Sequence, residues 1–152
     1  MTRKNLILLA TLGSAALLGG AFAFQYLGGM PPCKMCLWQR WPHAAAIVIG
    51  ILGFATGRRE LAIAGILAAL TTSGIGFYHA GVEQMWWQGP TTCTSGSIAG
   101  LTTDDLLAQI MEAPVVRCDE IAWSLFGMSM AAWNAIISFI LAGIWFKAYQ
   151  KR

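Results

Sequence analysis

The stretch that decides the fold is Trp38–Thr56, "WQRWPHAAAIVIGILGFAT". Its uncharged part, residues 43–56, is too short to cross a membrane, because a spanning helix needs about 20 apolar residues. A helix that begins at Trp38 has 19 residues and a length of about 28 Å, which is close to the ~30 Å of the hydrocarbon core. The segment therefore spans a membrane only if Arg40 and Trp41 belong to its outer end.

Three other stretches are long and apolar enough to span a membrane alone, and they cover residues 5–27, 61–82 and 123–146. Only 11% of the residues are charged, whereas an average soluble chain has about 25%. Together with residues 38–56, these stretches predict an all-α membrane protein that forms a bundle of four transmembrane helices. We expect one integral-membrane domain over residues 1–152.

The first stretch has a second interpretation. Arg3 and Lys4 precede an apolar run that ends near Ala21-Phe22-Ala23, and this order is typical of a cleaved signal peptide. The run is longer than the usual signal core of about 7–15 residues. The sequence therefore favours a retained span.

Lysine and arginine are distributed unevenly between the two ends of the predicted bundle. Seven of the ten lie at the termini or in the turn between the second and third spans, and three lie at the opposite end: Lys34, Arg40 and Arg117. Because cytoplasmic loops carry the excess of positive charge, both termini are expected in the cytoplasm. Residues 28–37 and 83–122 are then outer loops, which face the periplasm if the membrane is a bacterial inner membrane. The net charge of +3 thus reports topology, and no basic patch indicates nucleic acid as a partner.

The second outer loop contains the segment "TTDDLLAQIM", residues 102–111, which predicts a short helix. Thr102 can cap its start together with Asp105 three residues later. The leucines, Ile110 and Met111 of this segment share one face. Such an amphipathic pattern indicates a helix that lies on the membrane surface.

All four cysteines fall in the outer loops: Cys33 and Cys36 in the first, Cys93 and Cys118 in the second. Disulfides form and persist in the bacterial periplasm. The second half of the pattern lacks the C-x2-C of a zinc ribbon, so no metal site is expected. For Cys93 and Cys118, a structural disulfide and a redox pair both remain open. A bridge between Cys33 and Cys36 closes too small a loop to stabilise the chain much, so this pair indicates redox chemistry.

The setting of the first cysteine pair favours a reactive thiolate. Pro31 and Pro32 can start a helix, which places Cys33, Cys36 and Arg40 on one helical face at i, i+3 and i+7. The positive end of the helix dipole and the arginine one turn beyond Cys36 both favour the thiolate, which is the nucleophile. In the alternative interpretation, Arg40 only extends its charged end to the membrane surface.

Two histidines lie near the outer end of the predicted bundle. Pro42 is expected to interrupt its helix, because a residue before a proline is biased away from helical angles, so we expect His43 at the membrane interface. His79 lies near the outer end of residues 61–82, at the depth of the cysteine pair. A histidine there either is hydrogen-bonded within the structure or contacts a ligand.

Three segments carry a resemblance to a known family: "CKMCLWQR" (33–40), "YHAGVEQMWWQGPTTC" (78–93) and "RCDEIAWSLFGMSMAAWN" (117–134). With four spans and a cysteine pair in each outer loop, the chain resembles the disulfide bond formation protein B (DsbB) family of bacterial inner-membrane thiol oxidases. The likeness covers nearly the whole chain and is strongest to alphaproteobacterial-type members.

The resemblance implies an electron route. A reduced periplasmic thioredoxin-like oxidase, similar to DsbA, would attack a Cys93–Cys118 disulfide, with Cys93 forming the mixed disulfide. The electrons would then pass to Cys33–Cys36, and from Cys36 to a membrane quinone.

The resemblance also implies that Arg40 holds this quinone, either ubiquinone or menaquinone, and that His79 contacts it. Two other functions compete. One is an enzyme of the vitamin K epoxide reductase type, which would work in the reducing direction. The other is a membrane scaffold without catalytic activity whose outer loops are held by disulfides.

Overall fold

The computed structural model describes residues 1–90, 102–104, 107, 111 and 116–151. The long helices in these ranges are α1 (Arg3–Tyr26), α2 (Lys34–Thr56), α3 (Leu61–Glu83) and α5 (Met130–Gln150), and the strands are β1 (Ser124–Leu125) and β2 (Met128–Ser129). The described part is thus essentially all-helical, as the sequence predicted. Cys93 lies outside the described residues.

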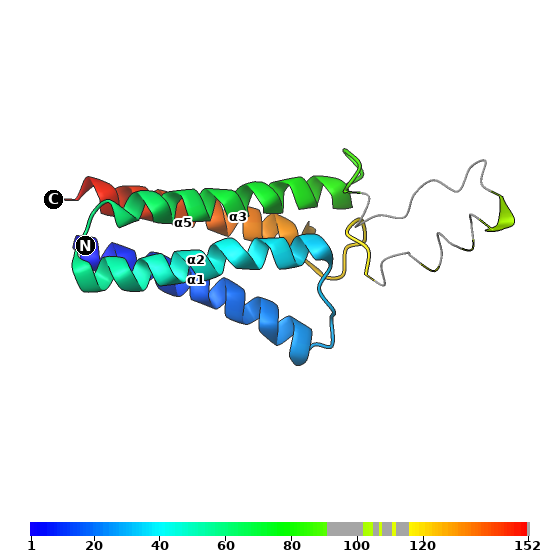
Figure 1. Ribbon diagram of the computed structural model, residues 1–152, viewed down its shortest axis with the longest axis horizontal. Coiled ribbons are helices and arrows are strands. Elements are labelled where there is room, and N and C mark those ends of the chain that lie inside the picture. The colour runs from blue at the N-terminus through cyan, green and yellow to red at the C-terminus, as the bar shows by residue number, and fades with distance from the viewer. Residues whose placement is uncertain (91–101, 105–106, 108–110, 112–115, 152) are drawn as a thin grey trace.

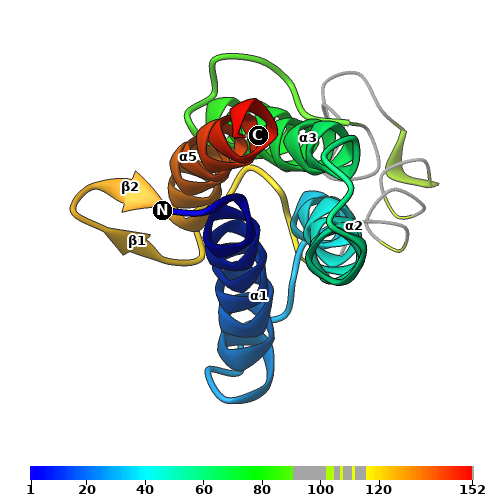
Figure 2. The ribbon, with the colours of Figure 1, turned by 90° about the vertical axis from the view of Figure 1, so that its left-hand side faces the viewer.

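The long helices run side by side in alternating directions, and both chain termini lie at the same end of the bundle (Figure 1). Seen along their length, they form a ring in which each helix packs on two neighbours, in the order α1, α2, α3 and α5 (Figure 2). Residues 27–33, 84–90 and 116–129 lie at the end of the bundle opposite the termini, so this end holds the cysteines that the structure describes.

Small residues let the helices approach closely in the core. A Cβ atom added to Gly65 of α3 would collide with the ring of Trp145 on α5, and Trp145 is fully buried. A Cβ atom added to Gly50 of α2 would collide in the same way with the side chain of Thr11 on α1. Close backbone approach of this kind is typical of packed membrane helices, whose surroundings provide little hydrophobic force between them.

Large apolar side chains cover the outside of the bundle. Leu12, Ile51, Leu67 and Phe139, one from each long helix, are all more than half exposed, which is the pattern of a surface that faces lipid. Within the described ranges, α1, α3 and α5 are long and apolar enough to cross a membrane. The count of four spans stays a prediction, because α2 begins with polar turns.

The expectation that Pro42 ends a helix is wrong. α2 continues through Pro42, and His43 is buried instead of lying at the membrane interface. Its Nε2 donates a hydrogen bond to Oδ1 of Asn134 on α5, at 2.8 Å. A proline removes only one intrahelical hydrogen bond, and contacts from neighbouring helices compensate for this loss in a packed bundle.

The last helix begins at Met130, seven residues after the start of the uncharged stretch at Trp123. Residues 124–129 form the β1–β2 hairpin, which stands beside the ring of helices (Figure 2). Phe126 and Gly127 at its tip both have positive φ angles, as two-residue hairpin turns require. Ser129 then caps α5 by accepting a hydrogen bond from the Ala132 amide.

Half of the short helix expected at residues 102–111 falls outside the described residues. Those of its residues that are described and helical are 103, 104, 107 and 111. The amphipathic face and the capping role of Thr102 therefore stay predictions.

Candidate active site

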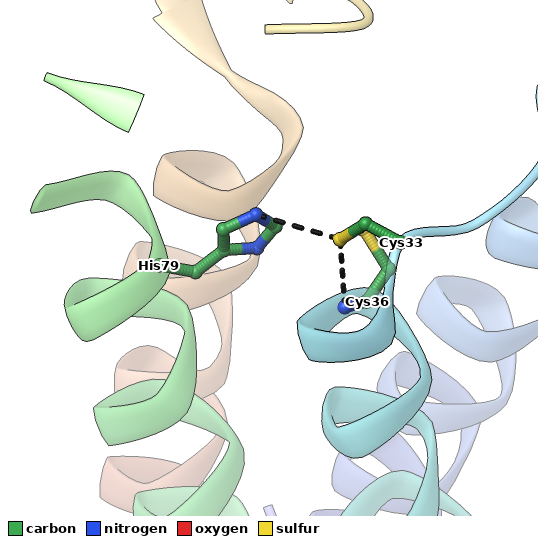
Figure 3. A group of neighbouring side chains, drawn as sticks. All are labelled: Cys33, Cys36 and His79. Atoms are coloured by element: carbon green, nitrogen blue, oxygen red, sulfur yellow. Dashed lines mark hydrogen bonds between the residues drawn. The ribbon is translucent and has the colours of Figure 1, made fainter. Parts of the chain in front are cut away.

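The first cysteine pair lies at the start of α2. Cys33 is the N-cap residue, and its Sγ accepts a hydrogen bond from the Cys36 amide at 3.2 Å. The helix thus starts just after the two prolines, and its first turn brings the two sulfurs to 2.7 Å from each other (Figure 3). A disulfide has its sulfurs about 2.05 Å apart, so the pair can open and close with a movement of less than about 1 Å.

The two thiols share a proton unequally. The Cys33 thiol donates a hydrogen bond to the Cys36 sulfur, which raises the pKa of Cys33, and burial raises it further. The same hydrogen bond lowers the pKa of Cys36. Cys36 is half-buried whereas Cys33 is buried. In the reduced pair, Cys36 is therefore the thiol that loses its proton first.

His79 reaches the same sulfurs from α3. Its Nε2 lies 3.6 Å from the Cys33 Sγ (Figure 3), and its Nδ1 lies 3.0 Å from the Gln39 side-chain nitrogen. The ring is only 3% exposed. His79 is thus a hydrogen-bonded core residue and also a neighbour of the reactive pair.

Cys118 of the second outer loop belongs to the same cluster. It is fully buried, and it packs with Cys33, Met35 and Val82. Its carbonyl oxygen accepts a hydrogen bond from His79 Nε2 at 3.2 Å. Residues far apart in the sequence therefore bring one sulfur from each outer loop together beside one histidine.

Arg40 contacts α1. Its guanidinium donates to Gln25 Oε1 at 2.6 Å and to the Ala21 carbonyl at 3.4 Å, and it lies over the ring of Phe22. Its Nε is buried and has no partner among the described residues. Arg40 thus lies half-buried between helices and does not extend to the surface. Its charge also helps to lower the pKa of Cys36, as predicted from the spacing of the two residues.

Three polar residues at this site were missed in the sequence. Gln39 and Asn134 hydrogen-bond each other inside the bundle, at 2.7 Å. Glu83 has a nearly buried side chain with Oε1 at 3.8 Å from His79 Nε2. Two signals point to them: polar residues inside apolar spans are costly and usually functional, and Glu83 follows His79 by four residues, which places both on one helix face.

The donor atoms of Cys33, Cys36 and His79 lie within 4.8 Å of one another, and such a set can be considered for zinc. Two thiolates on one tetrahedral zinc ion would have their sulfurs roughly 3.8 Å apart, given Zn–S bonds of about 2.3 Å. The observed 2.7 Å is much shorter. The spacing fits a pair that forms a disulfide better than a pair that holds a metal.

Comparison with known proteins identifies the family of this site. The sequence matches the family described as "Disulfide bond formation protein DsbB" over residues 3–148. The chain belongs to the DsbB family. "Disulfide bond formation protein B 2" of Pseudomonas savastanoi pv. phaseolicola is 32% identical over 148 residues, which cover 88% of this chain and 80% of the relative. "Disulfide bond formation protein B" of Albidiferax ferrireducens is 28% identical over 147 residues, with the same two shares. No solved structure matched the chain.

Membership confirms the resemblance that the sequence motifs carried. A DsbB-family chain is a membrane protein and a disulfide oxidoreductase. The chemistry of the family agrees with the geometry of this site, in which the sulfurs of Cys33 and Cys36 are close enough to form and break a disulfide.

Proposed function

We propose that the protein is a quinone-dependent thiol oxidase of the bacterial inner membrane, which reoxidises a periplasmic thioredoxin-like oxidase similar to DsbA. The observation that carries the proposal is the burial of Cys118 in one cluster with Cys33, at the end of an apolar helix bundle. A disulfide that only held the second loop together would not need to pack against the Cys33–Cys36 pair.

The relay consists of four thiol–disulfide exchanges. The partner's thiolate attacks the Cys93–Cys118 disulfide at Cys93, and the partner's second thiol displaces Cys93, which leaves the partner oxidised and both loop cysteines reduced. Cys118 then attacks the Cys33–Cys36 disulfide at Cys33, and Cys36 leaves as a thiolate. Finally Cys93 attacks Cys118, which restores the loop disulfide and releases Cys33 as a thiolate.

The quinone fits the residues present. A bound quinone would supply an acceptor for two electrons and two protons. Arg40 would hold it, because the buried Nε of Arg40 has no partner in the described part of the chain and can donate to a carbonyl oxygen. Cys36 is the more exposed residue of the pair, so a lipid-soluble acceptor can approach it. A contact from His79 to the quinone, whether ubiquinone or menaquinone, stays part of this proposal.

The proposal places four spans in the membrane, with α2 entering at Trp38 and both termini in the cytoplasm. Two observations support this topology: the termini lie at one end of the bundle (Figure 1), and seven of the ten lysines and arginines lie there or in the adjoining turn.

The test is thiol trapping in membranes from cells depleted of quinone. The proposed oxidase accumulates reduced Cys33 and Cys36, and added quinone reoxidises them. A scaffold would keep its disulfides in both conditions, and this result would overturn the proposal.

A further inference from the structure

A line of buried polar side chains leads from the bundle interior to the cysteine pair. We call it the polar chain, and its members in order are His43, Asn134, Gln39 and His79. The successive distances are 2.8 Å, 2.7 Å and 3.0 Å. Polar side chains in an apolar bundle are costly unless they are fully hydrogen-bonded, so this continuous line calls for a role.

The direction of each hydrogen bond is fixed by neighbouring backbone carbonyls. The Gln39 side-chain nitrogen lies 3.2 Å from the Met35 carbonyl, which can only accept, so this nitrogen and not the amide oxygen faces His79. In the same way, the Asn134 side-chain nitrogen lies 3.4 Å from the Thr72 carbonyl and 3.1 Å from its hydroxyl. The nitrogen of Asn134 therefore donates to the Gln39 oxygen.

These directions determine where His79 carries its proton. Nδ1 faces the Gln39 donor, so Nδ1 must accept and has no proton. Nε2 faces the Cys118 carbonyl at 3.2 Å, so Nε2 must carry a proton. The same Nε2–H lies 3.6 Å from the Cys33 sulfur. His79 is held as a neutral imidazole with its single N–H directed at the redox cluster.

We propose that the polar chain keeps His79 a neutral Nε2–H donor, and that it thereby keeps the negative charge of the reduced pair on Cys36. A neutral N–H donates to the Cys33 sulfur, whose thiol donates in turn to Cys36, so all donors point the same way and strengthen one another. An imidazolium in this position would instead attract the charge to Cys33. Gln39 and Asn134 are thus positioning residues, which act on the sulfurs through His79.

Other charged groups around His79 have to be weighed. Glu83 on α3 would favour an imidazolium, but its Oε1 lies 3.8 Å from Nε2, which is beyond hydrogen-bonding distance. From α2 the titratable neighbours are Cys33 and Cys36, and from the second loop Cys118. From α5, the residue that acts on His79 through Gln39 is the uncharged Asn134. The Gln39 donor on Nδ1 therefore opposes the charge of Glu83.

The experiment records nitrogen-15 spectra of the histidines in the full-length, reduced protein in lipid nanodiscs. The chain has two histidines, and a His43→Gln variant assigns them. In the unmodified protein we expect His79 to be protonated at Nε2 alone. In Gln39→Glu a carboxylate faces Nδ1 and cannot donate, so His79 is expected to be protonated at both nitrogens.

A second measurement reports which sulfur of the reduced pair carries the negative charge. Alkylation of the reduced protein at neutral pH, resolved by peptide mass spectrometry, gives the ratio of Cys36 to Cys33 labelling. An opposite charge nearby shifts a pKa by about one unit or more, so we expect Gln39→Glu to lower this ratio by about tenfold or more.

Two control variants distinguish a change in the direction of the polar chain from a general disturbance of the packing around it. Ser138→Ala removes a hydrogen bond of 3.3 Å to Asn134 Oδ1 without changing the direction of the polar chain, and Glu83→Gln removes the carboxylate. Both are expected to leave the His79 proton on Nε2.

The proposal is overturned if His79 in the unmodified protein is protonated at Nδ1 or at both nitrogens, and this result needs no variant to fold. It is also overturned if Gln39→Glu changes neither the protonation of the His79 ring nitrogens nor the ratio of Cys36 to Cys33 labelling. The inference rests on the proposed function only for the role of Cys36 as electron donor. Loss of quinone-linked turnover would refute that function and leave the ring spectra unaffected.

Discussion

Replacement of Arg40 by alanine tests the proposed quinone contact. The guanidinium is held in place by Gln25 at 2.6 Å and by the ring of Phe22, and its Nε remains a buried donor without a partner among the described residues. A hydrogen bond from a charged group contributes about 1.5–3 kcal/mol, and each 1.4 kcal/mol is a factor of ten in affinity. We therefore expect Arg40→Ala to raise the apparent KM for quinone by about 10- to 100-fold.

The assay is steady-state oxidation of a reduced periplasmic partner by the purified protein, with a short-chain quinone as the varied substrate. Arg40→Lys is expected to recover part of the loss, because it restores the charge without the planar group of donors. Gln25→Ala is the matched control, since it removes the residue that holds Arg40 but leaves the donor, and its effect should be smaller. Thermal unfolding of each variant identifies losses that come from destabilisation. An unchanged apparent KM and turnover number in Arg40→Ala would refute the contact and leave Arg40 a structural link between α1 and α2.

Four further predictions follow from the site and the bundle. Cys118→Ala should accumulate a mixed disulfide between Cys93 and the periplasmic partner, visible as a reduction-sensitive band on a non-reducing gel; turnover without any such adduct would contradict the relay. Because the pKa of Cys36 is lowered, its alkylation in the reduced protein should persist below the ordinary thiol pKa near 8.5. The rate should fall only as the pH drops through the lowered pKa. A rate that already falls at about pH 8–9 would contradict a hydrogen bond from the Cys33 thiol to the Cys36 sulfur. A thiol reagent confined to the cytoplasm should label none of the cysteines in intact cells, and labelling of any would reverse the proposed topology. Gly65→Ala places a Cβ against a tryptophan ring of α5 and should destabilise the bundle by about 1–3 kcal/mol, whereas Gly74→Ala, with open space around its Cβ, should be neutral in the same denaturation assay.

The helical class and the redox pair could be predicted from the sequence because their signals are local. Long uncharged stretches report apolar helices whatever their neighbours are. Likewise, the C-x-x-C spacing places Cys33 and Cys36 on adjacent positions of one helical turn, so their proximity needs no tertiary information. The resemblance motifs surround these same residues, which explains why the family could be predicted as well.

The remaining features depend on contacts between segments. Pro42 is a helix breaker by local rules, yet the neighbouring helices tolerate it and bury His43 against Asn134. Arg40 turns to α1 because Gln25 and Phe22 are there to receive it. Neither outcome can be derived without knowing which helices are adjacent in space.

The start of α5 shows a different difficulty. An uncharged stretch marks where a helix is possible, but its first residue is set by turn and capping chemistry. Gly127 and Ser129 carry that signal here, in a positive φ angle and in an N-cap. An N-cap residue inside an apolar stretch, here Ser129, therefore marks the first residue of the helix more closely than the start of the uncharged stretch does.

The burial of Cys33 and Cys118 also affects which reductants the protein can accept. Both sulfurs are nearly inaccessible, at 5% and 0% exposure, and thiol–disulfide exchange requires direct attack on a sulfur atom. Small dissolved thiols therefore cannot reduce either atom without opening the cluster. Of the first pair, only Cys36, which is half-buried, stays open to such attack.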